Sequence, residues 1–444
     1  MKEILVIGAG RSASSLIQYL LQQSTDHDWH ITIADTDVGL AQEKLAGHPN
    51  GVAVSFDIFD ETEKEVYFKK ADLVVSMLPA SLHKEVANSC LKHGRHLLTA
   101  SYISQEMRAL SADAKEKGLV FLNECVLDPG IDHMTGKQAI DSIAKAGGVL
   151  KSFKSFTGGL VAPQSDNNPW KYKFTWNPRN VVLAGQGTAK FIRQGRYKYI
   201  PYHSLFTRTE PISIEGWGDF EGYPNRDSLK YRQQYDLLDI PTMIRGTLRR
   251  PGFCEAWNVF VHLGLTDDSY TLEDSENMTY RDYINTFLYY HPDKTVEDKL
   301  CEHLKLNRPG EIYDRIAWTG LFENKKIGLS HASPAKILQH LLEEKWSLDP
   351  EDKDMIAMQH QFEYELENQT HRLISSLVTL GSDRLHTAMS KTVGWPLGIS
   401  AKLVLTDQIK SRGVITPMLP EVYNPVLKEL DSLGVQMQEV QSII

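Results

Sequence analysis

An apolar run, a glycine-rich turn and an amphipathic segment follow one another at residues 4–22, and no other feature of the sequence constrains the fold as strongly. Residues 4–7 are Ile, Leu, Val and Ile, a run typical of a buried strand. Residues 14–22 carry apolar side chains at helical spacing. The turn between them has the pattern G-x-G-x-x-A and consists of Gly8, Ala9, Gly10, Arg11, Ser12 and Ala13. Strand, glycine turn and helix in this order predict the dinucleotide-binding unit of a Rossmann domain.

The small residues of this turn each have a physical role in binding a dinucleotide. Gly8 allows the chain to turn sharply after the strand, and Gly10 lets the backbone approach the pyrophosphate. Ala13 keeps the helix close to the strand. The helix N-terminus then presents unpaired N–H groups and a positive dipole to the phosphates. We therefore expect all six residues of the turn to contact the cofactor.

Asp35 ends the second predicted strand, which covers residues 31–34. In this fold an acid at that position accepts hydrogen bonds from the adenosine ribose hydroxyls and repels a 2′-phosphate. The alternative is that Asp35 only begins a turn, in which Asp37 caps the next helix. The ribose role favours NAD as the cofactor and leaves NADP possible.

Strands and helical segments continue to alternate up to residue 122. Further strands are predicted at 52–54, 72–78, 96–99 and 120–122. This alternation predicts an α/β fold with a doubly wound parallel sheet. Ligands of such sheets bind beyond the carboxyl ends of the strands. The residues near these ends that we expect to contact the dinucleotide are Asp57, Ile58, Ser76, Leu78, Ser101, Leu127, Asp128 and Ile131.

Composition argues against several other classes of protein. The formal net charge of −9 repels nucleic acid and anionic membranes. No apolar run reaches the roughly 20 residues that cross a bilayer, and no signal peptide is recognisable. The four cysteines lack CxxC or metal-ligand spacing, which indicates free thiols in a reducing compartment and no metal site. We expect a cytoplasmic protein that binds neither nucleic acid nor membrane.

Residues 123–133, NECVLDPGIDH, resemble the NE-x-x-LDPGIDH segment of the glutamate-forming saccharopine dehydrogenases, also called saccharopine reductases. Other blocks are similar to that family in the same order, and 255–385 is the least distinctive part. These blocks are SMLP at 76–79, TASY at 99–102, GGL at 158–160, YKF at 172–174, PNRDS at 224–228, RGTLR at 245–249 and the C-terminal segment 391–418. The resemblance covers most of the chain.

The resemblance implies an oxidoreductase that acts on a carbon–nitrogen bond. Saccharopine is a secondary amine that joins glutamate to the lysine side chain. Its oxidation with NAD(P) produces an imine, which water splits reversibly into L-glutamate and 2-aminoadipate 6-semialdehyde. The family also implies a homodimer. Fungal members that use NADP carry an arginine where this sequence has Asp35, and this departure keeps NAD as our prediction.

Two other functions stay open at this point. A related amine or imine oxidoreductase, such as carboxynorspermidine dehydrogenase, would share the Rossmann half of the chain. A dinucleotide-binding sensor would bind the cofactor without turnover.

The three carboxylates of saccharopine require cationic donors in the substrate site. Guanidinium groups bind carboxylates through two hydrogen bonds, and the family's blocks place Arg226 and Arg249 there. Thr247 and Leu248 precede Arg249 and are expected beside the substrate. Arg245 is a weaker candidate because it can serve the fold or the dimer instead.

The reaction also needs a proton acceptor, and three residues are candidates. Asp128 lies in the turn where hydride transfer is expected, Tyr102 follows the strand at 96–99, and His133 titrates in the useful pH range. His133 is equally suited to packing at a helix start. Ser101 and Tyr102 are expected to orient the substrate and the nicotinamide by hydrogen bonds.

A chain of 444 residues exceeds one ordinary core, so we expect several domains. The Rossmann domain is predicted at 1–130, with a C-terminal return at 391–444. An α+β substrate-binding domain follows at 131–265, and 266–390 forms a mainly helical part of the substrate and dimer domain.

Local patterns place elements inside these domains. Strand-like periods at 151–174, 212–217 and 257–265 predict a sheet, and helical spacing occurs at 335–345 and 354–373. Within the first of these stretches, Lys171 and Lys173 alternate with aromatic residues. We interpret that alternation as a strand with one buried face rather than a nucleic-acid surface.

Overall fold

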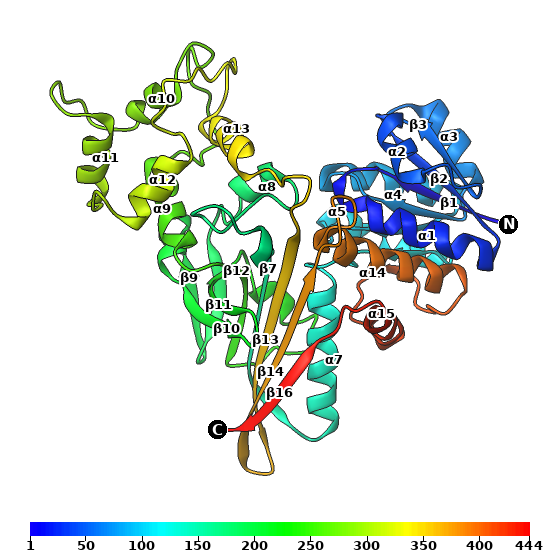
Figure 1. Ribbon diagram of the computed structural model, residues 1–444. Coiled ribbons are helices and arrows are strands. Elements are labelled where there is room, and N and C mark those ends of the chain that lie inside the picture. Colours follow the sequence, from blue (N-terminus) through cyan, green and yellow to red (C-terminus); the bar gives the residue numbers. More distant parts are fainter. The chain divides into compact units, whose positions relative to one another are not determined.

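The computed structural model describes residues 1–444 and divides into two compact units. The first unit contains residues 1–150, 364–371 and 377–444, and the second contains 151–363 and 372–376. No helix combines the length and the apolar character that crossing a membrane requires. Each unit is built on its own sheet (Figure 1).

The first unit is built on a parallel sheet of seven strands in the order β15-β6-β5-β4-β1-β2-β3. The strands are β1 (Lys2–Ile7), β2 (Trp29–Asp35), β3 (Gly51–Ser55), β4 (Leu73–Ser76), β5 (His96–Thr99), β6 (Val120–Leu122) and β15 (Gly413–Ile415). The order runs outward from β1 in both directions, which is the doubly wound arrangement, so the predicted fold class is confirmed for this unit.

Helices connect and cover these strands. They are α1 (Ser14–His27), α2 (Val38–Leu45), α3 (Glu61–Lys70), α4 (His83–His93), α5 (Gln105–Ala109), α6 (Ser111–Glu116), α7 (Ile131–Lys145), α14 (Ala388–Leu405) and α15 (Pro420–Ser432), and the C-terminal strand β16 (Gln438–Ile443) also belongs to this unit. Helix α14 runs beside α1 in Figure 1. A Cβ atom at Gly394 would lie only 2.3 Å from the backbone nitrogen of Leu16. The two helices therefore approach closely because residue 394 has no side chain.

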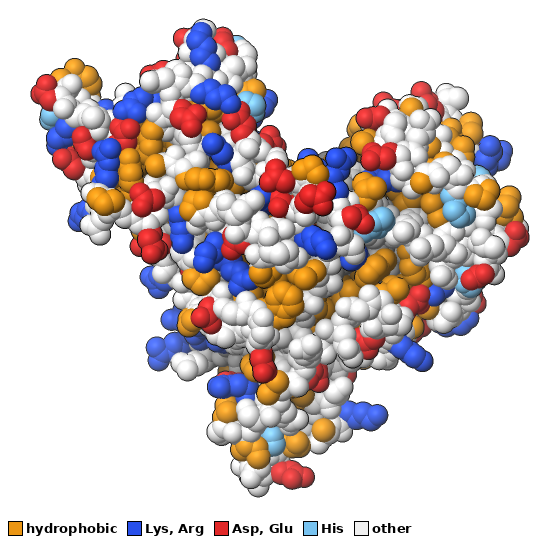
Figure 2. Space-filling model, viewed as in Figure 1, with side chains coloured by type: hydrophobic (Ala, Val, Ile, Leu, Met, Phe, Trp, Pro, Cys, Tyr) orange, Lys and Arg blue, Asp and Glu red, His pale blue; other side chains and the backbone are white.

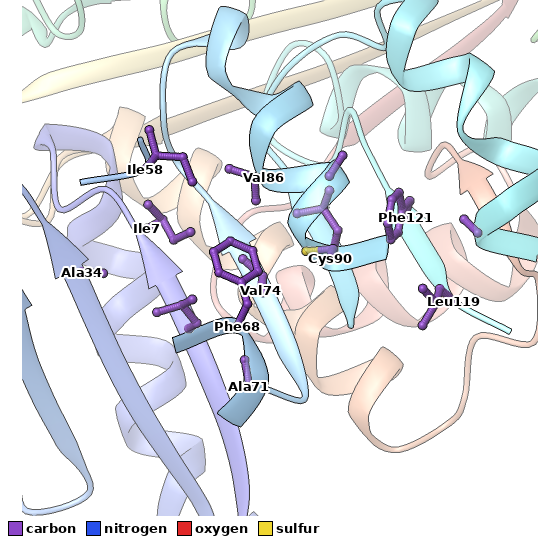
Figure 3. Packing of buried hydrophobic residues seen from close by; sticks show 14 of the residues in the cluster. Ile7, Ala34, Ile58, Phe68, Ala71, Val74, Val86, Cys90, Leu119 and Phe121 are labelled. Carbon is purple, nitrogen blue, oxygen red and sulfur yellow. The ribbon is translucent and has the colours of Figure 1, made fainter. Parts of the chain in front are cut away.

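One hydrophobic cluster of this unit lies between the sheet and the helices α3 and α4. Ile7, Phe68, Val74 and Val86 are almost completely buried there and point toward one another (Figure 3). Cys90 belongs to the same cluster, and burial raises the pKa of its thiol well above the ordinary value. The strands consist of continuous apolar runs because helices cover both faces of a parallel sheet.

The second unit is built on a mixed sheet whose strands follow the order β10-β11-β12-β7-β13-β14, with β8 and β9 attached beside β12. The strands are β7 (Val149–Val161), β8 (Ala189–Arg193), β9 (Arg196–Ile200), β10 (Glu210–Ile214), β11 (Gly218–Pro224), β12 (Thr242–Arg249), β13 (Asp354–Leu366) and β14 (Gln369–Leu380). Because β12 is parallel to β7 and antiparallel to β11, the sheet is of the α+β type that the sequence predicted. The helices are α8 (Pro178–Val182), α9 (Phe253–Leu263), α10 (Tyr280–Thr286), α11 (Val296–Leu304), α12 (Glu311–Trp318) and α13 (Pro334–Trp346).

Three local predictions in this unit are wrong. Residues 354–373, predicted as helix, form β13 and the start of β14, because pairing within the sheet outweighs the helical propensity of their Glu, Gln and Leu residues. Residues 257–265, predicted as strand, lie mostly in α9, since a short apolar run that is buried on all sides has no diagnostic period. Residues 170–176 form no strand, because Tyr172, Lys173 and Phe174 are all buried and no exposed face alternates with them.

Acidic and basic side chains are interspersed on the face shown in Figure 2. Several of them form exposed ion pairs, such as Lys92 with Glu65 at 2.8 Å. Exposed pairs of this kind contribute at most about 1 kcal/mol each. The stability of the first unit therefore rests mainly on its buried apolar side chains.

We predict that Phe68→Ala lowers the free energy of unfolding by about 3–5 kcal/mol, because it leaves a cavity in the core. The matched control is Val66→Ala on the same helix, since the side chain of Val66 is 45% exposed, and it should change the free energy of unfolding by less than about 0.5 kcal/mol. Urea unfolding of both variants measures the difference. Equal effects of the two substitutions would contradict this account of the core.

Candidate functional site

The glycine-rich turn connects β1 to α1 and leaves an open surface at its centre. Gly8 has a φ of +103°, and a Cβ atom there would lie 3.1 Å from the carbonyl carbon of Met77, so glycine is required. A Cβ atom at Gly10 would meet nothing within 4 Å. No side chain caps the helical turn that begins at Arg11, so its first N–H groups are available to a ligand. The turn therefore fits the phosphates of a dinucleotide.

Asp35 lies at the end of β2 and faces this turn. Its Oδ2 accepts a hydrogen bond from the backbone N–H of Ala9 at 2.6 Å, and its Oδ1 accepts one from the N–H of Asp37 at 2.9 Å. Asp37 in turn caps α2 by accepting from the N–H of Gly39. The carboxylate of Asp35 thus begins the β2–α2 turn and also lies against the glycine-rich turn. Its contact with the adenosine ribose stays a prediction.

Lys44 is a basic residue of this region that sequence analysis missed. It extends from α2, and its Nζ donates a hydrogen bond to the Oγ of Ser14 at 2.8 Å. Burial lowers the pKa of Lys44, while the nearby carboxylates of Glu43 and Asp35 oppose that change. The negative charge of Asp35 thus acts on Lys44, whose ammonium group donates a hydrogen bond to Ser14 at the start of α1.

The ends of β4 and β5 are joined by a histidine that sequence analysis also missed. The Nδ1 of His83 lies 2.9 Å from the Oγ of Ser76, and its Nε2 lies 2.8 Å from the Oγ of Ser101. Ser76 and Ser101 are predicted cofactor residues, and His83 starts α4 between them. A lone histidine at a helix start carries no sequence signal of this contact, because the contact depends on three separate elements.

Tyr102 and Asp128 lie together, as expected of strand-end residues. The hydroxyl of Tyr102 donates a hydrogen bond to the Oδ1 of Asp128 at 2.8 Å. The turns that carry them are tied together by Glu124, whose Oε1 accepts from the N–H of Ile103 at 2.9 Å. The structure therefore brings together two of the three residues that the sequence offered as candidate proton acceptors.

His133 is completely buried beneath this pair. Its Nε2 lies 3.5 Å from the Oε2 of Glu124, and its Nδ1 lies 3.8 Å from the Oδ2 of Asp132. All three side chains are 3% exposed or less. This location suits a residue that holds the turn in place.

The other predicted cofactor residues differ in exposure. Asp57 is exposed after β3, where its Oδ1 accepts from the N–H of Phe59 at 2.9 Å, and Leu78 is half-buried after β4. Ile58, Leu127 and Ile131 are buried, so they offer a ligand mainly their backbone groups.

In the second unit, Arg249 is a buried cation that forms no ion pair, although Glu221 lies opposite it on β11. Its side chain is only 5% exposed, and its Nη1 donates to the carbonyl of Leu248 at 2.8 Å. The guanidinium lies over the rings of Tyr172, at 5.1 Å, and Phe253, at 5.3 Å. Its Nε has no hydrogen-bond partner. A buried charge usually has a partner, so Arg249 is suited to receive a carboxylate.

The neighbours of Arg249 on β12 divide between the two faces of the sheet. Arg245, Thr247 and Arg249 alternate along the strand and share one face, whereas Leu248 is fully buried on the other. Arg245 lies over the ring of Tyr231 at 4.3 Å and is 8% exposed. A role of Arg245 in packing the second unit is consistent with this buried contact.

Arg226 follows β11 in an exposed turn. Its φ of +51° is unusual for a residue other than glycine, and such conformations collect at functional sites. Its carbonyl accepts a hydrogen bond from the N–H of Lys190 at 2.7 Å. The backbone of the PNRDS segment is therefore anchored while the side chain of Arg226 extends outward.

No group of three or more His, Cys, Asp or Glu side chains in this structure is arranged to hold a metal ion. The four cysteines are all free thiols.

Family models match nearly all of the chain. Residues 4–122 match the saccharopine dehydrogenase NADP binding domain, and residues 126–435 match the saccharopine dehydrogenase C-terminal domain. These matches support nicotinamide dinucleotide binding by the first unit, as the turn predicted.

Relatives with curated names agree over the full length. Saccharopine dehydrogenase [NADP(+), L-glutamate-forming] is 31% identical in Schizosaccharomyces pombe and 32% identical in Saccharomyces cerevisiae, and each alignment covers 99% of both chains. The mitochondrial alpha-aminoadipic semialdehyde synthase of Mus musculus is 31% identical over 98% of this chain and 47% of that protein. The fungal names specify NADP and do not support our preference for NAD.

A solved structure has the same fold. It is the apo, histidine-tagged saccharopine dehydrogenase (L-Glu forming) from Saccharomyces cerevisiae, which superposes with a TM-score of 0.90 and 31% identity over 100% of both chains. The resemblance that the NECVLDPGIDH segment indicated is therefore confirmed. The chain belongs to the saccharopine dehydrogenase family.

Proposed function

We propose that this protein is a saccharopine dehydrogenase that oxidises saccharopine reversibly to L-glutamate and 2-aminoadipate 6-semialdehyde. The names of its full-length relatives support this substrate. The structural observation that carries the proposal is the hydrogen bond between Tyr102 and Asp128, at the edge of the sheet where dinucleotides bind in this fold. A carboxylate at that edge supplies the proton acceptor that oxidation of an amine requires.

The residues of the first unit position the reactants. A bound nicotinamide would supply the acceptor for the hydride of the lysine-side carbon of saccharopine. Asp128 accepts the proton that the secondary ammonium group of the substrate loses and releases it to solvent. The same carboxylate then accepts a proton from the water that attacks the imine and returns it to the nitrogen that leaves as the amino group of glutamate. Tyr102 donates to Asp128 and so fixes the orientation of that carboxylate. Ser101 orients the substrate and the nicotinamide by hydrogen bonds.

Arg226 and Arg249 bind carboxylates of the substrate, and Thr247 lies on the same face of β12 as Arg249. The main support is the burial of Arg249 without an ion pair and with its Nε unbonded, because a substrate carboxylate would accept a hydrogen bond there. The left-handed backbone at Arg226 supports a role for the second arginine. Leu248 contributes through its backbone.

A steady-state assay tests the proposed function directly. Purified protein with saccharopine and either NAD or NADP should increase the absorbance of reduced nicotinamide, and glutamate should form in equal amount. Quenching of NADH fluorescence without any saccharopine-dependent change in absorbance would favour a dinucleotide-binding sensor instead.

We propose further that NAD is the preferred cofactor of this chain. The carboxylate of Asp35 lies 2.6 Å from the N–H of Ala9 in the glycine-rich turn, where its charge would repel a 2′-phosphate. Lys44, the nearby cation, donates one hydrogen bond to Ser14.

Asp35→Ser should lower the ratio of kcat/KM with NAD to kcat/KM with NADP by roughly tenfold or more, the effect of losing a charged hydrogen bond. The matched control is Asp37→Ser in the same turn, which removes a carboxylate but keeps a hydroxyl that can cap α2, and it should leave the ratio unchanged. Kinetics with both cofactors measure the ratio for each variant. An unchanged ratio in Asp35→Ser would remove Asp35 from the ribose role.

Arg249→Gln should raise the KM for saccharopine by an amount that corresponds to roughly 2–3 kcal/mol, because a charged hydrogen bond to a carboxylate is lost. The KM for the dinucleotide should change little. Arg250→Gln is the control, because Arg250 donates to the carbonyl of Trp217 and lies over Phe220 at the next position. Similar KM values for saccharopine in both variants would exclude Arg249 from the substrate site.

The oligomeric state and the cellular location of the protein are proposed from the same family relationship. We propose a homodimer formed through the second unit and a cytoplasmic location, in which the four cysteines remain reduced. Light scattering should give twice the 50.3 kDa mass of the chain, and a mass of one chain would contradict the dimer.

A further inference from the structure

His83 connects two serines at the carboxyl edge of the first sheet. Strands β4 and β5 are parallel neighbours, with Ser76 opposite Thr99, so their ends lie side by side. The imidazole of His83 fills the space between these ends, with Nδ1 at 2.9 Å from the Oγ of Ser76 and Nε2 at 2.8 Å from the Oγ of Ser101. The histidine itself is only 5% exposed. Both ring nitrogens are therefore committed to hydroxyl groups.

The ring of His83 is neutral at physiological pH. Burial lowers the pKa of His83 to about 4. A neutral imidazole has one N–H donor and one acceptor nitrogen, so one serine donates to the ring and the other accepts from it.

The burial of Ser76 decides which serine donates. Ser76 is 0% exposed, and the imidazole of His83 is the hydrogen-bond partner of its hydroxyl. If this hydroxyl only accepted, its proton would be buried without an acceptor, which is costly. Ser76 therefore donates to Nδ1, and the proton of the imidazole is on Nε2. His83 then donates to Ser101.

This direction leaves the proton of Ser101 available. The backbone of Ser101 is already fixed, because its carbonyl accepts a hydrogen bond from the N–H of Glu124 at 3.3 Å. Ser101 is only half-buried and precedes Tyr102, whose hydroxyl donates to Asp128. With one lone pair of its Oγ taken by His83, the hydroxyl of Ser101 can donate to a molecule bound beside Tyr102.

We propose that His83 is a positioning residue, which uses its Nε2–H to hold the hydroxyl of Ser101 as a hydrogen-bond donor toward the reactants. This inference rests on the proposed saccharopine dehydrogenase activity. His83 acts through Ser101 and touches neither substrate nor cofactor.

A double-mutant cycle with His83→Leu and Ser101→Ala tests this proposal. His83→Leu should lower kcat for saccharopine oxidation by about tenfold and change the KM for the dinucleotide less than about twofold. In the Ser101→Ala background, the same substitution should cause less than about a twofold further loss. His83→Gln should recover much of the activity, because its amide can donate near the position of Nε2. Equal losses in both backgrounds would overturn the proposal.

The matched control is His93→Leu at the other end of α4. His93 lies 3.4 Å from Glu65 and forms no hydrogen bond with Ser76 or Ser101, so kcat should be unchanged. A loss equal to that of His83→Leu would indicate a general effect on the helix and would contradict the proposal.

A measurement on the unmodified protein requires neither a correctly folded variant nor the substrate. Nitrogen-15 NMR of the imidazole should show a proton on Nε2, an unprotonated Nδ1 and no titration between about pH 5.5 and about pH 8, a range that includes the ordinary His pKa of ~6.5. A proton on Nδ1, or titration in that range, would overturn the proposal. If the protein has no saccharopine activity but shows this NMR signature, the proposed function fails and the arrangement of His83 stands.

Discussion

Parallel pairing of β1 with β2 and β4 is the constraint on which the candidate site depends. Strands that run in the same direction bring their carboxyl ends to one edge of the sheet, and each end carries its turn there. Gly8 permits the first turn, and Asp35 bonds to that turn from the neighbouring strand. The same geometry joins the ends of β4 and β5 through His83. The chemistry of the first unit is thus a consequence of strand direction.

The second unit contributes a different physical element, a charge that is buried before any ligand arrives. Arg249 is held between aromatic faces and a backbone carbonyl, so its desolvation is already complete in the folded protein. A carboxylate that pairs with such a group gains a strong interaction in a medium of low dielectric constant, because the guanidinium needs no further desolvation. The aromatic rings that pack in this unit therefore also keep the guanidinium out of water.

Much of the fold and part of the site could be predicted from local sequence. The turn at Gly8, the acid at Asp35 and the pair of Tyr102 with Asp128 follow from motifs whose spacing reflects backbone geometry. The role of His83 could not be predicted, because its contacts join residues from three elements and no periodicity encodes them. The strands at 354–366 and 369–380 were missed because their pairing partners are distant in sequence, so local propensity pointed to helix.

In the proposed reaction, hydride passes from saccharopine to a nicotinamide at the edge of the first sheet. The most direct measurement uses saccharopine that carries deuterium on the lysine-side carbon attached to nitrogen, followed by NMR of the nicotinamide product. The account predicts that deuterium appears on the nicotinamide ring and that glutamate forms in equal amount. Glutamate without transferred deuterium, or a dinucleotide that remains oxidised throughout, would contradict it.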